Sequence, residues 1–89
     1  MKFPFSYNLS PNFEPTVFWQ AVSTLDDVYG AWAQESWEDP LDGDLFKRYV
    51  SEHCIIEVRC DWDTGAAFIN SSVDLKDVFG LPNVNEGHR

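Results

Sequence analysis

The sequence predicts an α+β domain: a small antiparallel sheet, made of an edge strand and a C-terminal hairpin, with about two to four helices packed on one face. Three observations lead to this prediction. Apolar and polar residues alternate near the N-terminus and again in 54–62, a helical spacing of apolar residues lies between these segments, and residues 63–65 are a turn signal. We expect one domain, 1–89, with a loose polar tail from about residue 83.

Residues 2–9 are the first expected strand, because aromatic residues and a leucine alternate there with polar residues and a proline. Pro4 cannot donate a ladder hydrogen bond, which places this strand at a sheet edge or near its own start. Glu14 and Pro15 then open a helix. Its apolar residues recur at three- and four-residue spacing as far as Trp32, which we expect to face the core.

The extent of this helical region stays open. One interpretation is a single helix that continues to Trp37. The other is two helices of about nine and fourteen residues, with the second capped at Ser23 or Thr24 and a bend at Gly30.

Residues 38–43 combine proline, glycine and aspartates, and therefore predict a turn. Asp42 or Asp44 is expected to cap a short helix that runs to about Glu52. The apolar side of this helix would be Leu45, Phe46, Tyr49 and Val50. Lys47 and Arg48 would be its basic residues and could fold back toward the acidic turn.

The strongest strand signal is 54–62, where Ile56, Val58 and Cys60 alternate with charged residues. The charged face of that strand is expected to be solvated or functional. A short hairpin turn follows, with Gly65 at positive φ, and residues 66–70 form the return strand. A last helix, 73–79, is stopped by glycine and proline.

The charge balance selects the class of partner. The chain has 15 acidic and 6 basic residues, a formal net charge of -9, and no Lys or Arg between Lys2 and Lys47. Phosphate backbones and anionic membrane surfaces would be repelled, so we expect no direct nucleic-acid or membrane binding. A basic protein would be attracted, and long-range attraction would speed its association. Acidity that only keeps the protein soluble is the competing explanation.

The two cysteines indicate a reducing compartment. Cys54 and Cys60 would lie roughly 20 Å apart on one strand, whereas a disulfide needs Cα atoms within about 7 Å. We therefore expect reduced thiols and, since the start of the chain has no secretory pattern, a cytoplasmic protein. No residue spacing matches a zinc finger. Asp61 and Asp63 begin a calcium-loop pattern that fails at its twelfth position, Ser72, so no metal or cofactor is predicted.

Another motif carries a family resemblance. Its segments are Asp63-Thr64-Gly65-Ala66, Phe68-Ile69-Asn70 and Val78-Phe79-Gly80-Leu81-Pro82. They resemble the catalytic segment of the retroviral-type aspartic proteases, where the aspartate, here Asp63, pairs with its twin in a homodimer to activate water. The resemblance ends there, because the long stretch that builds the flap in that family is missing. The same residues suit a plain hairpin turn, and we expect no enzymatic activity.

The stretch from Trp32 to Asp44 is the candidate site, because it combines carboxylates with tryptophans and has no positive charge. The residues expected to contact a partner are Glu35, Trp37, Glu38, Asp39, Asp42 and Asp44, with Asp26 and Asp27 extending the surface. Trp37 could serve either as an exposed anchor or as core. In size and charge the chain resembles small acidic inhibitors as a class: immunity proteins that neutralise nuclease toxins, and phage-encoded inhibitors of host defence nucleases, such as anti-CRISPR proteins or nucleic-acid mimics.

Another class stays open, in which the contact is apolar. Phe3, Phe5 and Tyr7 on an edge strand could pair with a strand of a partner, as in a non-enzymatic adaptor or subunit. A homodimer is compatible with that interpretation.

Overall fold

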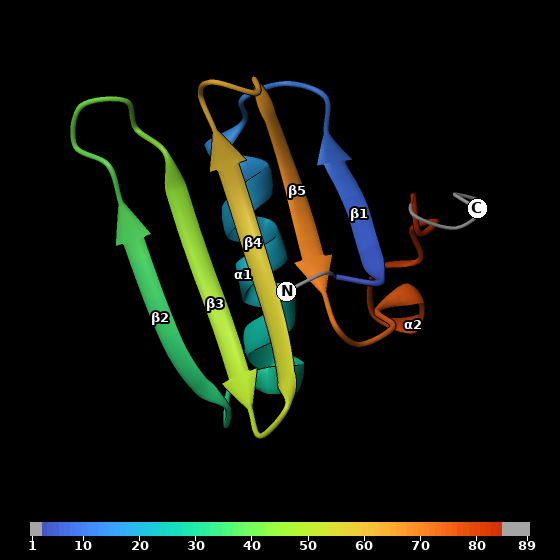
Figure 1. The fold of residues 1–89 in the computed structure, drawn as a ribbon. Coiled ribbons are helices and arrows are strands. Elements are labelled where there is room, and N and C mark those ends of the chain that lie inside the picture. Colours follow the sequence, from blue (N-terminus) through green and yellow to red (C-terminus); the bar gives the residue numbers. More distant parts are fainter. Residues whose placement is uncertain (1–2, 85–89) are drawn as a thin grey trace.

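Five antiparallel strands form one sheet in the order β1-β5-β4-β3-β2 (Figure 1). The computed structural model describes residues 3–84. Its elements are β1 (Phe5–Ser10), α1 (Pro15–Tyr29), β2 (Ala33–Glu38), β3 (Leu45–Ser51), β4 (Cys54–Asp61), β5 (Ala66–Ser71) and α2 (Lys76–Phe79).

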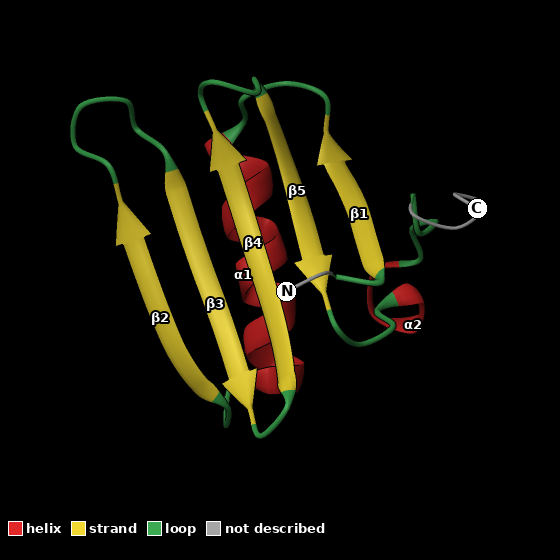
Figure 2. Ribbon diagram, viewed as in Figure 1, coloured by secondary structure: helices red, strands yellow, loops and turns green. Residues whose placement is uncertain are grey.

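The helix α1 connects the two edges of the sheet. It leaves β1 at one edge, crosses a single face, and delivers the chain to β2 at the other edge (Figure 2). From there β2 to β5 follow as successive hairpins that return to β1. In the described residues no helix covers the opposite face of the sheet, which we call the open face.

The core lies between α1 and the sheet. Phe18, Val22 and Leu25 project from α1, because residues four and three apart share one side of a helix. The sheet contributes alternate residues from four strands. These are Tyr7, Leu45, Tyr49, Ile56, Val58, Cys60, Ala67 and Ile69.

The predicted fold class is wrong in its proportions. The sheet has five strands where an edge strand and a hairpin were expected, and a single long helix of 15 residues packs on it. The only other helix in the described part, α2, has 4 residues. The difference arises in residues 33–51, where predicted helix is strand.

Both interpretations of 15–37 as helix are wrong, because α1 ends at Tyr29. A side chain at Gly30, the residue directly after α1, would collide with the backbone oxygen of Asp26, so this position requires glycine. Trp32 is half-buried and meets Tyr29 edge-on at 4.8 Å between ring centroids. Its predicted place beside the core is confirmed, although it lies beyond the helix.

The predicted helix to Glu52 is also wrong, since Leu45–Ser51 is β3. Leu45 and Tyr49 are buried against α1, while Phe46, Arg48 and Val50 lie on the open face. The apolar residues of this segment have a helical spacing, and neither of its alternate sets is uniformly apolar. Pairing with β2 and β4 overrides that local signal.

The C-terminal hairpin confirms its prediction. β4 and β5 coincide with the expected strands within a residue or two, and Gly65 has φ of 64°. The last helix is shorter than expected, and Gly80 ends it in the left-handed conformation, with φ of 68°. Cys54 and Cys60 are free thiols.

The predicted loose tail is ordered where it begins. Asn83 accepts a hydrogen bond from the Ser6 amide at 2.8 Å, and the Val84 amide donates to the Ser6 carbonyl at 2.8 Å. Together they cover part of the outer edge of β1. The rest of the predicted tail lies outside the described residues. No helix in the described part is long and apolar enough to cross a membrane.

Candidate protein-binding site

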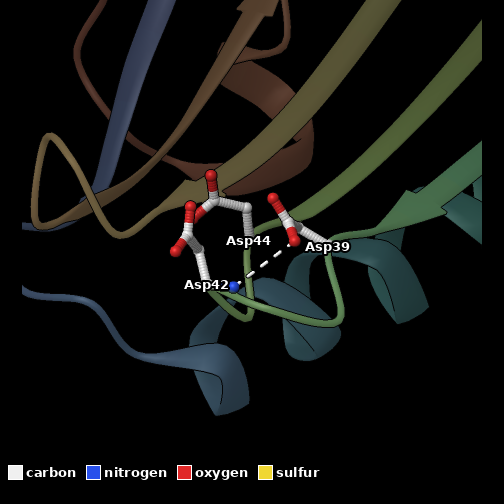
Figure 3. Close-up of side chains that lie close together, drawn as sticks. All are labelled: Asp39, Asp42 and Asp44. Atoms are coloured by element: carbon white, nitrogen blue, oxygen red, sulfur yellow. Dashed lines mark hydrogen bonds between the residues drawn. The ribbon is translucent and has the colours of Figure 1, made fainter.

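The acidic turn between β2 and β3 is held by the carboxylate of Asp39 (Figure 3). Asp39 Oδ1 accepts hydrogen bonds from the amides of Leu41 at 2.8 Å and Asp42 at 3.4 Å. The Asp39 amide donates to the Asp44 carbonyl at 2.9 Å, and Gly43 takes positive φ, 77°. An aspartate that bonds its following amides stabilises a turn, so the turn predicted here is confirmed together with its cause.

The carboxylates of Asp39, Asp42 and Asp44 lie within 4.8 Å of one another and could each offer one oxygen to a cation. Asp39 and Asp44 already accept backbone hydrogen bonds. Asp42 is exposed, and repulsion from Asp39, followed by slight desolvation and the charges of Asp44 and Asp63, raises its pKa. Hydrogen bonds to the loops therefore account for the positions of the Asp39 and Asp44 carboxylates.

Two other loops meet the acidic turn at the same end of the sheet (Figure 1). The Trp62 amide, in the β4–β5 turn, donates to Asp44 Oδ1 at 2.7 Å. Phe13, in the β1–α1 loop, meets the Trp62 ring edge-on at 5.2 Å and lies 3.7 Å from the position of a Cβ on Gly43. The three loops therefore form one continuous surface.

We call this surface the acidic end, and its residues are Glu14, Asp39, Leu41, Asp42, Asp44, Asp61, Trp62 and Asp63. Leu41 is 92% exposed and Trp62 is 61% exposed. Burial raises the pKa of Asp61, Arg59 opposes that rise, and Asp44 and Asp63 add to it. Carboxylates from three loops thus share one end of the sheet with two exposed apolar side chains.

Several residues of this surface were missed by sequence reasoning. Glu14, Leu41, Asp61, Trp62 and Asp63 were not assigned to the site. The signal was present in part. When successive antiparallel strands are joined by hairpin turns, every second turn falls at the same end of the sheet. Once 33–38 and 45–51 are strands, the turns at 39–44 and 62–65 necessarily meet.

Glu35 and Trp37 lie on the open face of β2, beside the acidic end. Trp37 is 57% exposed and pairs across the strands with Phe46. Its exposure resolves the choice between surface and core. Glu35 accepts a hydrogen bond from Arg48 at 3.2 Å, while Glu38 lies on the other side of β2, toward α1.

Arg48 does not neutralise the acidic turn. It binds Glu57 through two nitrogens, at 2.8 Å and 3.1 Å, and Glu57 also meets Arg59 at 3.5 Å. Glu57 is only 6% exposed, so the charged face predicted for this strand is partly a closed ion-pair network. The Lys47 ammonium lies 5.6 Å from the centre of the Tyr49 ring, on the α1 side of the sheet.

Asp26 and Asp27 belong to the opposite end of the molecule, near the C-terminus of α1 (Figure 1). The Tyr49 hydroxyl donates to Asp26 Oδ1 at 2.6 Å, which gives Asp26 a structural role. The structure therefore does not bring this pair together with the rest of the predicted surface.

Asp63 lies in the exposed β4–β5 turn, where the Gly65 amide donates to the Asp61 carbonyl at 3.0 Å. This is the hairpin geometry that the turn interpretation of the motif predicts. Comparison with known proteins adds no family to the argument: no protein-family model, no curated protein and no solved structure matches the chain.

Proposed function

We propose that this protein is a small acidic inhibitor, which binds and occludes a basic, nucleic-acid-binding site on another protein. The observation that carries the proposal is the convergence of three loops at the acidic end. Their carboxylates would stand where phosphates otherwise bind, and the exposed Leu41 and Trp62 would supply apolar contact on the same surface. The partner would be a nuclease toxin or a host defence nuclease complex, and the site of action would be the cytoplasm.

Charge supports this choice over a nucleic-acid or membrane ligand. The net charge is -9, and the cations Arg48 and Arg59 are engaged with Glu57. A strongly acidic surface raises the association rate with basic proteins and suppresses wrong partners. The adaptor alternative through Phe3, Phe5 and Tyr7 has less support, because Tyr7 is fully buried and the tail occupies part of the β1 edge.

The first experiment measures salt-dependent capture. The immobilised protein is exposed to lysates at low and high salt, and any captured protein is purified and assayed for nucleic-acid binding with and without the inhibitor. We expect a basic protein whose affinity falls about tenfold or more as salt rises, since surface charges are screened beyond about 10 Å at 0.1 M salt. Capture that does not respond to salt, or that leaves nucleic-acid binding unchanged, would contradict the proposal.

Charge reversal then locates the surface. Asp42 and Asp63 are the residues to reverse, because both are exposed and their carboxylates accept no hydrogen bond from the described residues. The double variant Asp42→Lys with Asp63→Lys should abolish binding to the captured protein. The matched control, Asp27→Lys with Asp77→Lys, carries the same charge change away from the acidic end and should bind normally. Equal loss in both variants would show that only net charge matters.

A further inference from the structure

The outer edge of β2 is open. β2 is the last strand of the sheet, all six of its residues are exposed, and no described segment pairs with its outer side. The other edge strand, β1, is partly covered by Asn83 and Val84. An open edge presents unpaired amides and carbonyls, which can pair with a strand from another chain. Among the described residues, the β2 edge is therefore the less covered of the two, and it adjoins the acidic end.

A groove borders residues 36–38 of this edge, on the α1 side of the sheet. α1 lies behind the middle of the sheet, and β2 extends beyond it (Figure 2). The space between them has a volume of about 200 Å³. It is lined by the buried Phe18 and Leu45, by Trp19 of α1, and by Ser36 and Glu38 of β2. Trp19 is 53% exposed there. A side chain from an added strand would enter this groove and cover Trp19.

The charges at the edge select the occupant. Glu35 and Glu38 lie on opposite sides of β2, and Asp39 follows directly. A second copy would bring two chains of formal charge -9 together with their glutamates along the same seam, where facing like charges are destabilising. A basic strand would meet the same carboxylates favourably.

We propose that an extended segment of the basic partner adds to β2 as a sixth strand of the sheet; this inference rests on the proposed function. Directly opposed residues share a face of an antiparallel pair. A lysine or arginine opposite Glu35 would lie on the open face beside Trp37, where it gains an aromatic ring and shares with Arg48 the Glu35 carboxylate, whose Oε1 already accepts from Arg48 at 3.2 Å. An apolar residue opposite Ser36 would fill the groove, because Lys47 borders it and disfavours a second cation.

The test uses a defined probe: an end-capped peptide of eight residues in which valine alternates with lysine or arginine. Its control has the same sequence with alternate backbone nitrogens methylated, which keeps every charge and removes the hydrogen bonds on one edge. We expect the control to bind at least tenfold more weakly at low salt. Hydrogen exchange should also slow at alternate β2 amides when the unmodified peptide binds.

A variant of the protein tests whether the Glu35 side chain recognises a cation of the peptide. Glu35→Gln should weaken the peptide severalfold, whereas Glu52→Gln, in the β3–β4 turn at the far end, should not. An unchanged affinity in Glu35→Gln would overturn the proposed recognition of a cation opposite that residue.

Three other results would overturn the inference. Equal binding of both peptides would show that the edge hydrogen bonds are not used. Protection confined to the loops of the acidic end would place the peptide there, and the proposed function would stand without the added strand. Protection of β2 amides in the protein alone, together with a dimer in sedimentation, would show that a second copy occupies the edge.

Discussion

The amide of Trp62 donates a hydrogen bond to Oδ1 of Asp44 across 2.7 Å, and this bond joins the β4–β5 turn to the β2–β3 turn. Asp44 was predicted as a partner-binding surface charge and, as the alternative to Asp42, as the cap of a helix that is in fact β3. Its carboxylate also organises the surface, as does that of Asp39, which caps its own turn. The acidic end therefore contains two kinds of carboxylate: those that hold loops, and those, such as Asp42 and Asp63, that are free to meet a partner.

Replacing Asp44 by alanine should lower the free energy of unfolding by about 1 to 2 kcal/mol, because the Trp62 amide loses its acceptor. Urea denaturation followed by tryptophan fluorescence measures the change. Asp42→Ala is the control, since its carboxylate accepts no hydrogen bond in the described structure. Equal stability of Asp44→Ala and Asp42→Ala, which each remove one charge from the cluster, would show that the bond between the two turns contributes nothing.

Neutralising Asp42 should stabilise the protein at neutral pH. Repulsion from Asp39, followed by slight burial and the charges of Asp44 and Asp63, raises the pKa of Asp42 above its ordinary 3.8. The folded state therefore binds this proton more readily than the unfolded state, so ionisation weakens the fold as pH rises through the raised pKa. Asp42→Asn removes that penalty.

We expect the melting temperature of Asp42→Asn to exceed that of the wild type at pH 7. The difference should vanish as pH falls below the ordinary pKa, where the wild-type carboxyl is also neutral. The control is Glu52→Gln, which removes one exposed charge at the opposite end of the sheet. A stabilisation that persists unchanged at pH 3 would contradict the electrostatic cause.

Removing the Arg48 side chain should lower the free energy of unfolding more than most single substitutions on the open face. Arg48→Met takes away both short hydrogen bonds to Glu57, a residue only 6% exposed, and leaves it the longer contact with Arg59. Loss of hydrogen bonds to a buried charge costs about 2 to 3 kcal/mol. Chemical denaturation of Arg48→Met and Arg59→Met gives the comparison, and the Arg59 variant should lose less.

The paired variant Arg48→Met with Glu57→Met separates charge from packing. Replacing both partners of a buried ion pair by apolar residues is often nearly neutral, so the double variant should recover most of the stability lost by Arg48→Met. If the double variant is as unstable as the single one, the stacking of the Arg48 guanidinium over the Phe46 ring, 5.1 Å from its centre, is what matters.

Tyr49→Phe tests the tie between the sheet and α1. The Tyr49 hydroxyl lies 2.6 Å from Asp26 Oδ1 and 3.3 Å from the Val22 carbonyl, and burial, with help from Asp26, raises the pKa of this hydroxyl strongly. Removing the hydroxyl should lower the free energy of unfolding by about 1 kcal/mol. Asp26→Asn keeps an acceptor for the hydroxyl and should cost less, as measured by the same denaturation experiment.

Local patterns predicted part of the molecule well. Apolar residues alternate in 54–62 and in the first strand, and this two-residue period does not match one face of a helix. The helix signal is Pro15 followed by the apolar stripe of Phe18, Val22 and Leu25. The turns at 39–44 and 62–65 follow from aspartate and glycine chemistry that acts within a few residues. The acidity of the surface is a property of composition.

The central error concerned β2. Its sequence, Ala-Gln-Glu-Ser-Trp-Glu, contains no β-branched residue and every position is exposed, so it carries no local strand signal. β3 carries a misleading signal, since its apolar residues have a helical spacing. The same error affected the predicted binding surface. With 15–37 interpreted as helix, Asp26 and Asp27 were included in that surface, and the β4–β5 turn was left out.

The sequence by itself determined the first strand, the start of α1, the C-terminal hairpin, the chemistry of the turns and the one-signed charge. Only the tertiary structure decided that 33–38 and 45–51 are strands and that three loops share one end. The physical reason is the range of the interactions. A helix and a turn are stabilised by neighbours a few residues away, whereas β2 and β3 depend on partners across the sheet: Arg48 meets Glu57 at a separation of 9 residues and Glu35 at 13.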